Sequence, residues 1–96
     1  MTHYVAIVED AGPESAVGIW FPDLPGCFSA GDTMDEALVN APEAVMLYVG
    51  MLERAGRRPP PARSLAELRG DPRFIEDSRN NLVAVVHIPQ AATAAE

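Results

Sequence analysis

The stretch from Trp20 to Ala37 constrains the fold more than any other part of the chain, because its local chemistry dictates most of its path. Pro22 and Pro25 each fix φ at about −65° and each remove a backbone donor, which disfavours a helix and interrupts strand pairing. Gly26 follows at once and can adopt a positive φ. We therefore expect a stiff turn that reverses the chain and returns it to the core through the apolar pair Cys27 and Phe28.

A helix is predicted to begin directly after this turn. Residues 33–36 have the S/T-x-x-E spacing of a capping box, in which the hydroxyl and the carboxylate satisfy each other's free amides. Apolar residues then recur at steps of three and four as far as Leu52, and Gly56 followed by three prolines ends the helix. Pro42 lies inside this helix without an amide to donate, so we expect a kink there or two helical pieces.

Four segments are rich in the β-branched and aromatic residues that favour strands, namely residues 4–9, 16–21, 27–30 and 82–88. Alternation in the second segment directs Val17, Ile19 and Phe21 into the core and Trp20 to the other face. The last segment does not alternate with polar residues. This pattern suits a parallel strand covered on both faces, or an edge strand that pairs with another molecule.

Two further segments lie between the main helix and the last strand. Residues 64–69 are predicted as a short helix with its own S-x-x-E cap, and residues 76–81 as a loop or turn. The main helix also carries a second apolar stripe that something must cover, either this short helix or another subunit. The stripe consists of Val39, Pro42, Met46 and Val49.

The length allows one domain, which we assign to residues 1–90, with a disordered tail at 91–96. The elements predict an α+β domain in the order β-β-β-α-(short α)-β, with two layers and the helices on one face of the sheet. No apolar run approaches the ~18 residues of a membrane span, and the start lacks the pattern of a secretion signal. We therefore expect a cytoplasmic protein.

The charge of the chain is unevenly distributed. The formal net charge is −7, and residues 1–56 contain nine acidic residues but a single base, Arg54. Such a field repels nucleic acid and attracts a basic partner. The arginines after residue 56 lack interleaved aromatic residues, so we interpret them as solvated loop residues and expect no direct DNA binding.

No constellation of residues indicates catalysis, a cofactor or a metal centre. Glu9, Asp10 and Asp23 are the acids to test for two-metal chemistry, but caps, helix dipoles and a solvated face account for nearly all the acids of the first 43 residues. His3 and His87 can approach each other if the first and last strands are adjacent and parallel, although histidines at a strand edge are more often plain surface residues than a metal or acid–base site. Cys27 has no basic neighbour in sequence, which favours a buried inert thiol over a nucleophile. The chain is therefore predicted not to be an enzyme.

The turn is instead the best candidate for a contact with another protein. An exposed aromatic residue beside rigid prolines has the composition of an interface anchor, although Trp20 can equally pack under the turn as a small satellite core. Two sets of residues are predicted as interfaces. The partner-binding set is Trp20, Pro22, Asp23, Leu24, Pro25, Glu9 and Asp10, and the oligomer interface is Val39, Met46, Val49, Val83 and Val85.

The sequence of the turn resembles the signature of HicB-type antitoxin domains. The similar string runs from Phe21 to Cys27, continues through residues 29–33 and includes Glu36 and Ala37, and the similarity covers roughly the first 60 residues closely. The resemblance implies a degenerate, partial RNase H-like fold with a mixed sheet in the strand order 3-2-1-4, in which the fourth strand runs parallel beside the first. It also implies that the domain neutralises a small basic RNA-cleaving toxin of the HicA type.

Family members often carry a DNA-binding unit after the last strand, and we expect this unit to be absent because the chain ends seven residues beyond Pro89. One alternative function is an orphan homo-oligomeric interaction domain without a toxin partner. A more distant alternative is a metal-dependent ribonuclease or hydrolase. Either an adjacent gene for a small basic protein or co-purification with one would favour the antitoxin.

Overall fold

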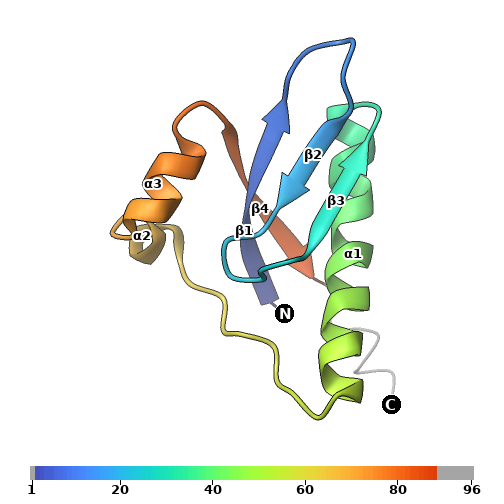
Figure 1. Cartoon of the computed structure of the whole chain (residues 1–96), viewed down its shortest axis with the longest axis vertical. Helices are drawn as coiled ribbons and strands as arrows, with labels where there is room; N and C mark the ends of the chain where they lie inside the picture. Colours follow the sequence, from blue (N-terminus) through green and yellow to red (C-terminus); the bar gives the residue numbers. More distant parts are fainter. Residues whose placement is uncertain (1, 89–96) are drawn as a thin grey trace.

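A computed structural model describes residues 2–88 as a four-stranded sheet with helices on both of its faces (Figure 1). The strand order is β3-β2-β1-β4, as the resemblance implied. The predicted tail at 91–96 lies outside the described residues. The elements are β1 (Thr2–Asp10), β2 (Val17–Trp20), β3 (Phe28–Gly31), α1 (Met34–Arg54), α2 (Leu65–Leu68), α3 (Pro72–Ser78) and β4 (Leu82–Ile88).

Every strand of the sheet is antiparallel to its neighbours, so the expectation of a parallel β4 was wrong. β4 pairs with β1 from Leu82 opposite Val8 to Ile88 opposite Thr2. The reason lies in the connection, because the chain leaves α1 at one end of the sheet, and the extended segment 55–64 followed by α2 and α3 carries it to the other end (Figure 1). β4 therefore starts where β1 ends and runs back along it.

The helices divide between the two faces of the sheet, whereas the sequence predicted them on one face. α1 packs on the face that includes Tyr4, Ala6 and Val8, and α2 and α3 contribute Leu68 and Phe74 to a second cluster on the other face. β1 is buried on both sides, because Tyr4, Ala6 and Val8 belong to the first cluster and Val5 and Ile7 to the second. The prediction that Val17, Ile19 and Phe21 face the main core is confirmed.

α1 is one continuous helix through Pro42, so the proline does not divide it into two pieces. One half of its predicted capping box is present, because the hydroxyl of Thr33 accepts a hydrogen bond from the Glu36 amide at 3.1 Å. The Glu36 carboxylate accepts from the Asp32 amide instead of the Thr33 amide. The helix starts so close to β3 that a Cβ on Gly31 would lie 2.5 Å from the amide nitrogen of Ala37. A glycine is therefore required where β3 meets the helix.

The segment before β4 contains both a confirmed and a wrong prediction. α2 forms with the expected capping box between Ser64 and Glu67. Residues 76–78, predicted as loop, belong instead to α3, which Asp71 caps and Pro72 begins. Both residues are common helix-start signals, and the polar composition of the segment masked them.

α2 does not cover the second stripe of α1, because it lies on the opposite face of the sheet. Val39 on that stripe remains 76% exposed, and Met46 is exposed as well. None of the helices within residues 2–88 has the length and apolar character needed to cross a membrane.

Candidate protein-binding cleft

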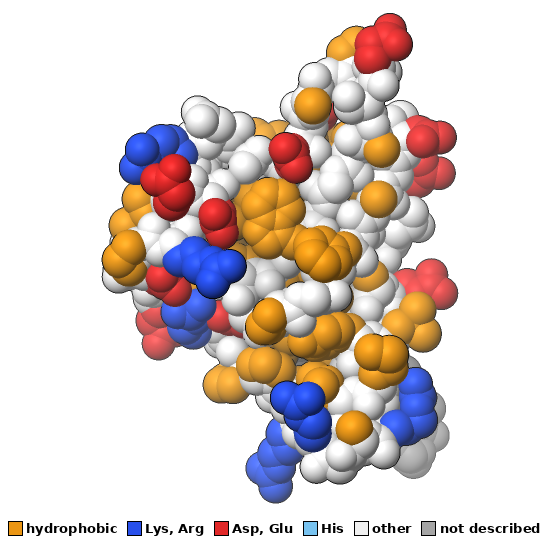
Figure 2. Space-filling model, viewed as in Figure 1, with side chains coloured by type: hydrophobic (Ala, Val, Ile, Leu, Met, Phe, Trp, Pro, Cys, Tyr) orange, Lys and Arg blue, Asp and Glu red, His pale blue; other side chains and the backbone are white. Residues whose placement is uncertain are grey.

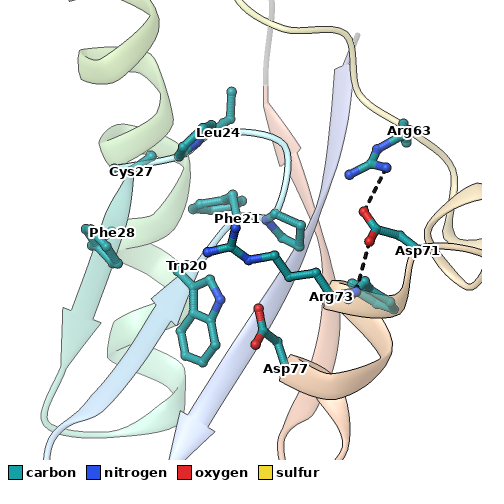
Figure 3. Close-up of a pocket in the computed structure, with 13 residues that line it drawn as sticks. Trp20, Phe21, Leu24, Cys27, Phe28, Arg63, Asp71, Arg73 and Asp77 are labelled. Carbon is teal, nitrogen blue, oxygen red and sulfur yellow. Dashed lines mark hydrogen bonds and ion pairs between the residues drawn. The ribbon is translucent and has the colours of Figure 1, made fainter.

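A cleft with a volume of about 280 Å³ opens between the end of β2, the proline turn and α3 (Figure 3). We call it the Trp20 cleft, after the residue at its floor. Trp20 and Phe28 both line it from neighbouring strands, and they are direct cross-strand partners. The cleft therefore has an aromatic floor built on the sheet.

The two aromatic side chains differ in how they are held. Trp20 is partly buried and packs against the cluster that contains Ile7 and Phe74, so it contributes to a satellite core and lines the cleft at the same time. Phe28 is 68% exposed, contrary to the expectation that it enters the core. Its neighbours Cys27 and Ser29 point inward, and alternation along the strand therefore turns Phe28 outward. Figure 2 shows hydrophobic side chains gathered over the middle of this face, with charged groups beside them.

α3 forms a charged wall of the cleft. Arg73 extends from this helix across the cleft toward Trp20, and Asp77 lies below it (Figure 3). Within residues 2–88, neither side chain takes part in an ion pair. One positive and one negative group are therefore available to a ligand beside the aromatic floor.

An ion-pair network joins the proline turn to α3 at the side of the cleft, where Arg63 and Asp71 are themselves lining residues. Arg63 donates from its main-chain N–H and from Nε to the two carboxylate oxygens of Asp23, each at 2.7 Å. Its Nη1 also donates to Asp71 at 3.1 Å. The Arg73 amide and the Arg63 guanidinium hold the pKa of Asp71 below its ordinary value, and the two carboxylates raise the pKa of Arg63. We call these three residues the Arg63 staple.

The turn itself is held rigidly. The Leu24 amide donates to the Phe21 carbonyl and the Cys27 amide to the Leu24 carbonyl, each at 3.0 Å. Gly26 has φ +89°, and the hydroxyl of Tyr48 on α1 donates to the Pro25 carbonyl at 2.6 Å. The cleft is therefore formed before any partner binds.

Cys27 behaves as the sequence predicted for a buried thiol. Burial raises its pKa to about 11, and its Sγ lies 3.7 Å from the Ala44 carbonyl. A thiol in this state is largely protonated at neutral pH and is a poor nucleophile.

The structure places the predicted partner-binding residues in different environments. Trp20, Pro22 and Pro25 line the Trp20 cleft. Leu24 is fully buried and lies at the edge of the cleft as part of the core, and the side chain of Asp23 is 7% exposed within the Arg63 staple. Leu24 and Asp23 therefore stabilise the fold from within the domain and offer little free surface to a partner.

The two acidic residues of that set do not line the cleft. Glu9 is exposed and shares the Trp20 face of the sheet, one pleat further along β1, since it pairs with Gly18 while Ile7 pairs with Trp20. Asp10 is exposed at the end of the strand, where it accepts a hydrogen bond from the Gly12 amide at 3.1 Å.

The sequence did not identify Phe28, Arg73 and Asp77 as residues of the site. Alternation from the inward-facing Cys27 could have indicated the exposure of Phe28. Arg73 and Asp77 come after the Asp71-Pro72 helix start and are four residues apart, which places them on one face of a helix. No feature of the sequence showed that this helix lies beside Trp20.

The predicted oligomer residues form two separate surfaces. Val83 and Val85 are exposed on β4 and share the face of their β1 partners, Ile7 and Val5, which is the face of α2 and α3. The stripe of α1 lies on the opposite side, where Val49 is partly packed against the main core. A single flat interface therefore cannot contain both sets.

The acids considered for metal chemistry do not converge in the structure. Across residues 2–88, no group of three or more His, Cys, Asp or Glu side chains is arranged to hold a metal ion. Two-metal hydrolysis requires several converging carboxylates, and residues 2–88 do not bring such a group together.

Comparison with known proteins identifies relatives of this chain. A 33-residue stretch is 64% identical to an uncharacterised 14.9 kDa protein in the rep-hol intergenic region of Haemophilus phage HP1, and it covers 33% of this chain and 25% of that protein. A 60-residue stretch is 37% identical to the UPF0150 protein Ta0767 of Thermoplasma acidophilum and covers 62% of this chain and 84% of that protein. The match to the phage protein thus spans about a quarter of its length.

Solved structures of antitoxins have a similar fold. The Burkholderia pseudomallei antitoxin HicB has a TM-score of 0.75 at 26% identity, covering 95% of this chain and 66% of that chain. A chain of the HicA3 and HicB3 toxin–antitoxin complex has a TM-score of 0.72 at 27% identity, covering 92% of this chain and 99% of that chain.

The family model described as "HicB_like antitoxin of bacterial toxin-antitoxin system" matches residues 4–95. This match covers nearly the whole chain and agrees with the sheet order and with the similarity to HicB structures. The chain therefore belongs to the HicB-like antitoxin family of bacterial toxin–antitoxin systems.

Proposed function

We propose that this domain neutralises a small basic RNA-cleaving toxin resembling HicA, and that it does so by covering the toxin's RNA-binding and catalytic surface in the cytoplasm. The domain acts by binding alone, without catalysis and without direct contact to DNA. The family supports an antitoxin role, and the similarity to a chain of a HicA3 and HicB3 complex supports a partner of this kind. The observation that carries the proposal is the exposed and preformed Trp20 cleft.

The aromatic floor supplies the apolar contact area of the proposed interface. Tryptophan and other large aromatic side chains dominate the binding energy of many protein interfaces when they are desolvated at the centre of the contact. Phe28 is exposed, and Trp20 is fixed from below by the satellite core. Because the turn and the Arg63 staple already hold this surface, binding costs little conformational entropy.

The charge of the domain supports a basic partner. With a net charge of −7, the domain attracts a basic protein over a distance and increases the rate of encounter at low salt. Glu9 on the Trp20 face and Asp77 in the cleft wall offer carboxylates where a toxin that cleaves RNA would otherwise hold phosphates. The acids therefore both steer the toxin and compete with RNA.

The test uses Phe28→Ala and Asp77→Lys in the full chain, mixed with a HicA-like toxin. Both positions accept substitution without opening the core, and each change is expected to weaken binding by about tenfold or more, as for residues near the centre of an interface. Leu47→Ala is the matched control, because Leu47 is an exposed apolar residue on α1 that lies outside both the cleft and the predicted oligomer surfaces. Calorimetry measures the affinity and RNA cleavage measures the protection. Wild-type binding by both cleft variants would contradict the proposed surface.

A second candidate function, self-association, is favoured by the exposed apolar residues outside the cleft. Val85 is 56% exposed on the edge strand β4, and Val39 and Met46 are exposed on α1. We propose that one of these two surfaces forms a homo-oligomer. Val85→Lys and Val39→Lys distinguish them, since only the change at the true interface shifts the sedimentation coefficient to that of a monomer. A wild-type protein that sediments as a monomer at micromolar concentration excludes this function.

A further inference from the structure

The antiparallel register of β1 and β4 brings together the two histidines of the chain. His3 and His87 are direct cross-strand partners, and their ring centroids lie 3.8 Å apart. The expectation that a parallel pairing would bring these two histidines together was wrong, because parallel strands would place them at opposite ends of the sheet. The pair is therefore a consequence of the tertiary structure.

We propose that His3 and His87 form a two-imidazole binding site for a divalent late transition-metal ion such as Ni²⁺, Cu²⁺ or Zn²⁺. Imidazole is a preferred ligand of these ions, and two nitrogens about 2.0–2.1 Å from a shared ion complete a chelate. Directly opposed residues on antiparallel strands have Cβ atoms about 4.5–5.5 Å apart, which is close enough for two rings to reach one ion. The site lies on the same face of the sheet as α2 and α3, beside a groove between α2 and β4 that His3 lines.

The surroundings of the pair leave its nitrogens accessible. Both side chains are exposed, and neither ring forms a hydrogen bond with a side chain or main-chain group of residues 3–88. His3 also lines an open groove of about 580 Å³ with Val85 and Glu67. The rings meet edge to face at 82°, so coordination requires a rotation about χ2 that aims one nitrogen of each ring at a common point.

The site supplies two protein ligands, because no third ligating side chain joins the histidines within the described part of the chain. Water completes the coordination shell, so the site is open. Its affinity should be higher for Cu²⁺ than for Ni²⁺ or Zn²⁺, as for most nitrogen sites. A bound ion would connect β1 to the edge strand β4 and would stabilise the folded protein by mass action.

The test is a Zn²⁺ titration of the untagged chain, followed by NMR of the imidazole signals and by thermal unfolding. The chain contains two histidines, so every imidazole signal reports on this pair. We expect both rings to shift together, and we expect Zn²⁺, but not Mg²⁺, to raise the Tm. His3→Gln and His87→Gln should each weaken binding by about tenfold or more, since even the outer partners of metal ligands contribute that much.

Glu67→Gln is the matched control, because Gln can also complete the α2 capping box and the groove keeps its shape. This variant should bind Zn²⁺ as the wild type does. Circular dichroism verifies that all variants are folded. The proposal is wrong if His87→Gln binds Zn²⁺ as tightly as the wild type, or if Zn²⁺ shifts carboxylate signals while the imidazole signals stay in place.

Discussion

The Arg63 staple gives the sharpest prediction about what holds the Trp20 cleft together. Asp23→Ala removes both hydrogen bonds between the turn and Arg63, one from a main-chain amide and one from the guanidinium. The Asp23 side chain is 7% exposed, so water replaces these contacts poorly in the folded protein. A hydrogen bond to a charged group contributes about 1.5–3 kcal/mol to stability. The bond to the main-chain amide and the bond to the half-exposed guanidinium are not additive, and we expect a total loss of about 2–3 kcal/mol.

This loss is measurable by urea unfolding and by calorimetry. For a domain of this size it corresponds to a decrease in Tm of about 10 to 20 °C, with an unchanged urea m-value. Asp23→Asn keeps the shape and one acceptor and should lose less. Glu14→Ala removes the same charge from an exposed loop and should change the free energy of unfolding by less than about 0.5 kcal/mol. If Asp23→Ala also falls within that limit, the staple does not hold the turn, and the reasoning that the cleft is preformed fails.

Three further predictions follow from the structure. Gly31→Ala should destabilise the domain strongly, because its Cβ would lie 2.5 Å from a backbone nitrogen of α1, whereas Gly18→Ala meets no atom within 4 Å and should be neutral in urea unfolding. Cys27 should react slowly with a thiol reagent in the folded protein at pH 8 and quickly in urea. Burial raises the pKa of this thiol from about 9 to about 11, so over that pH range the unfolded state loses the proton first and the stability of the fold decreases. The pKa of Asp71 is lowered in the folded state, so its contribution is present at neutral pH and is lost as pH falls below about 4. Asp71→Asn should therefore flatten the acid side of a plot of stability against pH, and an unchanged acid limb would contradict this assignment.

The turn and the start of α1 were predictable because their physics is local. Two prolines and Gly26 define the reversal within seven residues, and Thr33 and Glu36 cap the helix through atoms three residues apart. The same holds for the cap of α2. In each case the residues that decide the structure are neighbours in the chain, so no distant contact is needed to read them.

The site depended on contacts that a sequence pattern does not contain. Asp23 looked like an exposed anchor because its partner Arg63 lies 40 residues away. Phe28 looked like a core residue because apolar character alone does not tell which face of a strand a side chain takes. The wall of the cleft was missed because the last residues of α3, 76–78, were read as a loop and because the place of this helix beside Trp20 is set by packing.

The sequence by itself therefore determined the strand, turn and helix elements of the first half, the family, and the acidic character of the domain. The tertiary structure decided the direction of β4, the division of the helices between two faces, and the pairing of His3 with His87. The physical reason is that hydrogen-bonding patterns and caps act over a few residues, whereas strand direction depends on the length and path of the connection. In this chain α2 and α3 lengthen the connection enough to carry it across the sheet, and the last strand consequently returns antiparallel to the first.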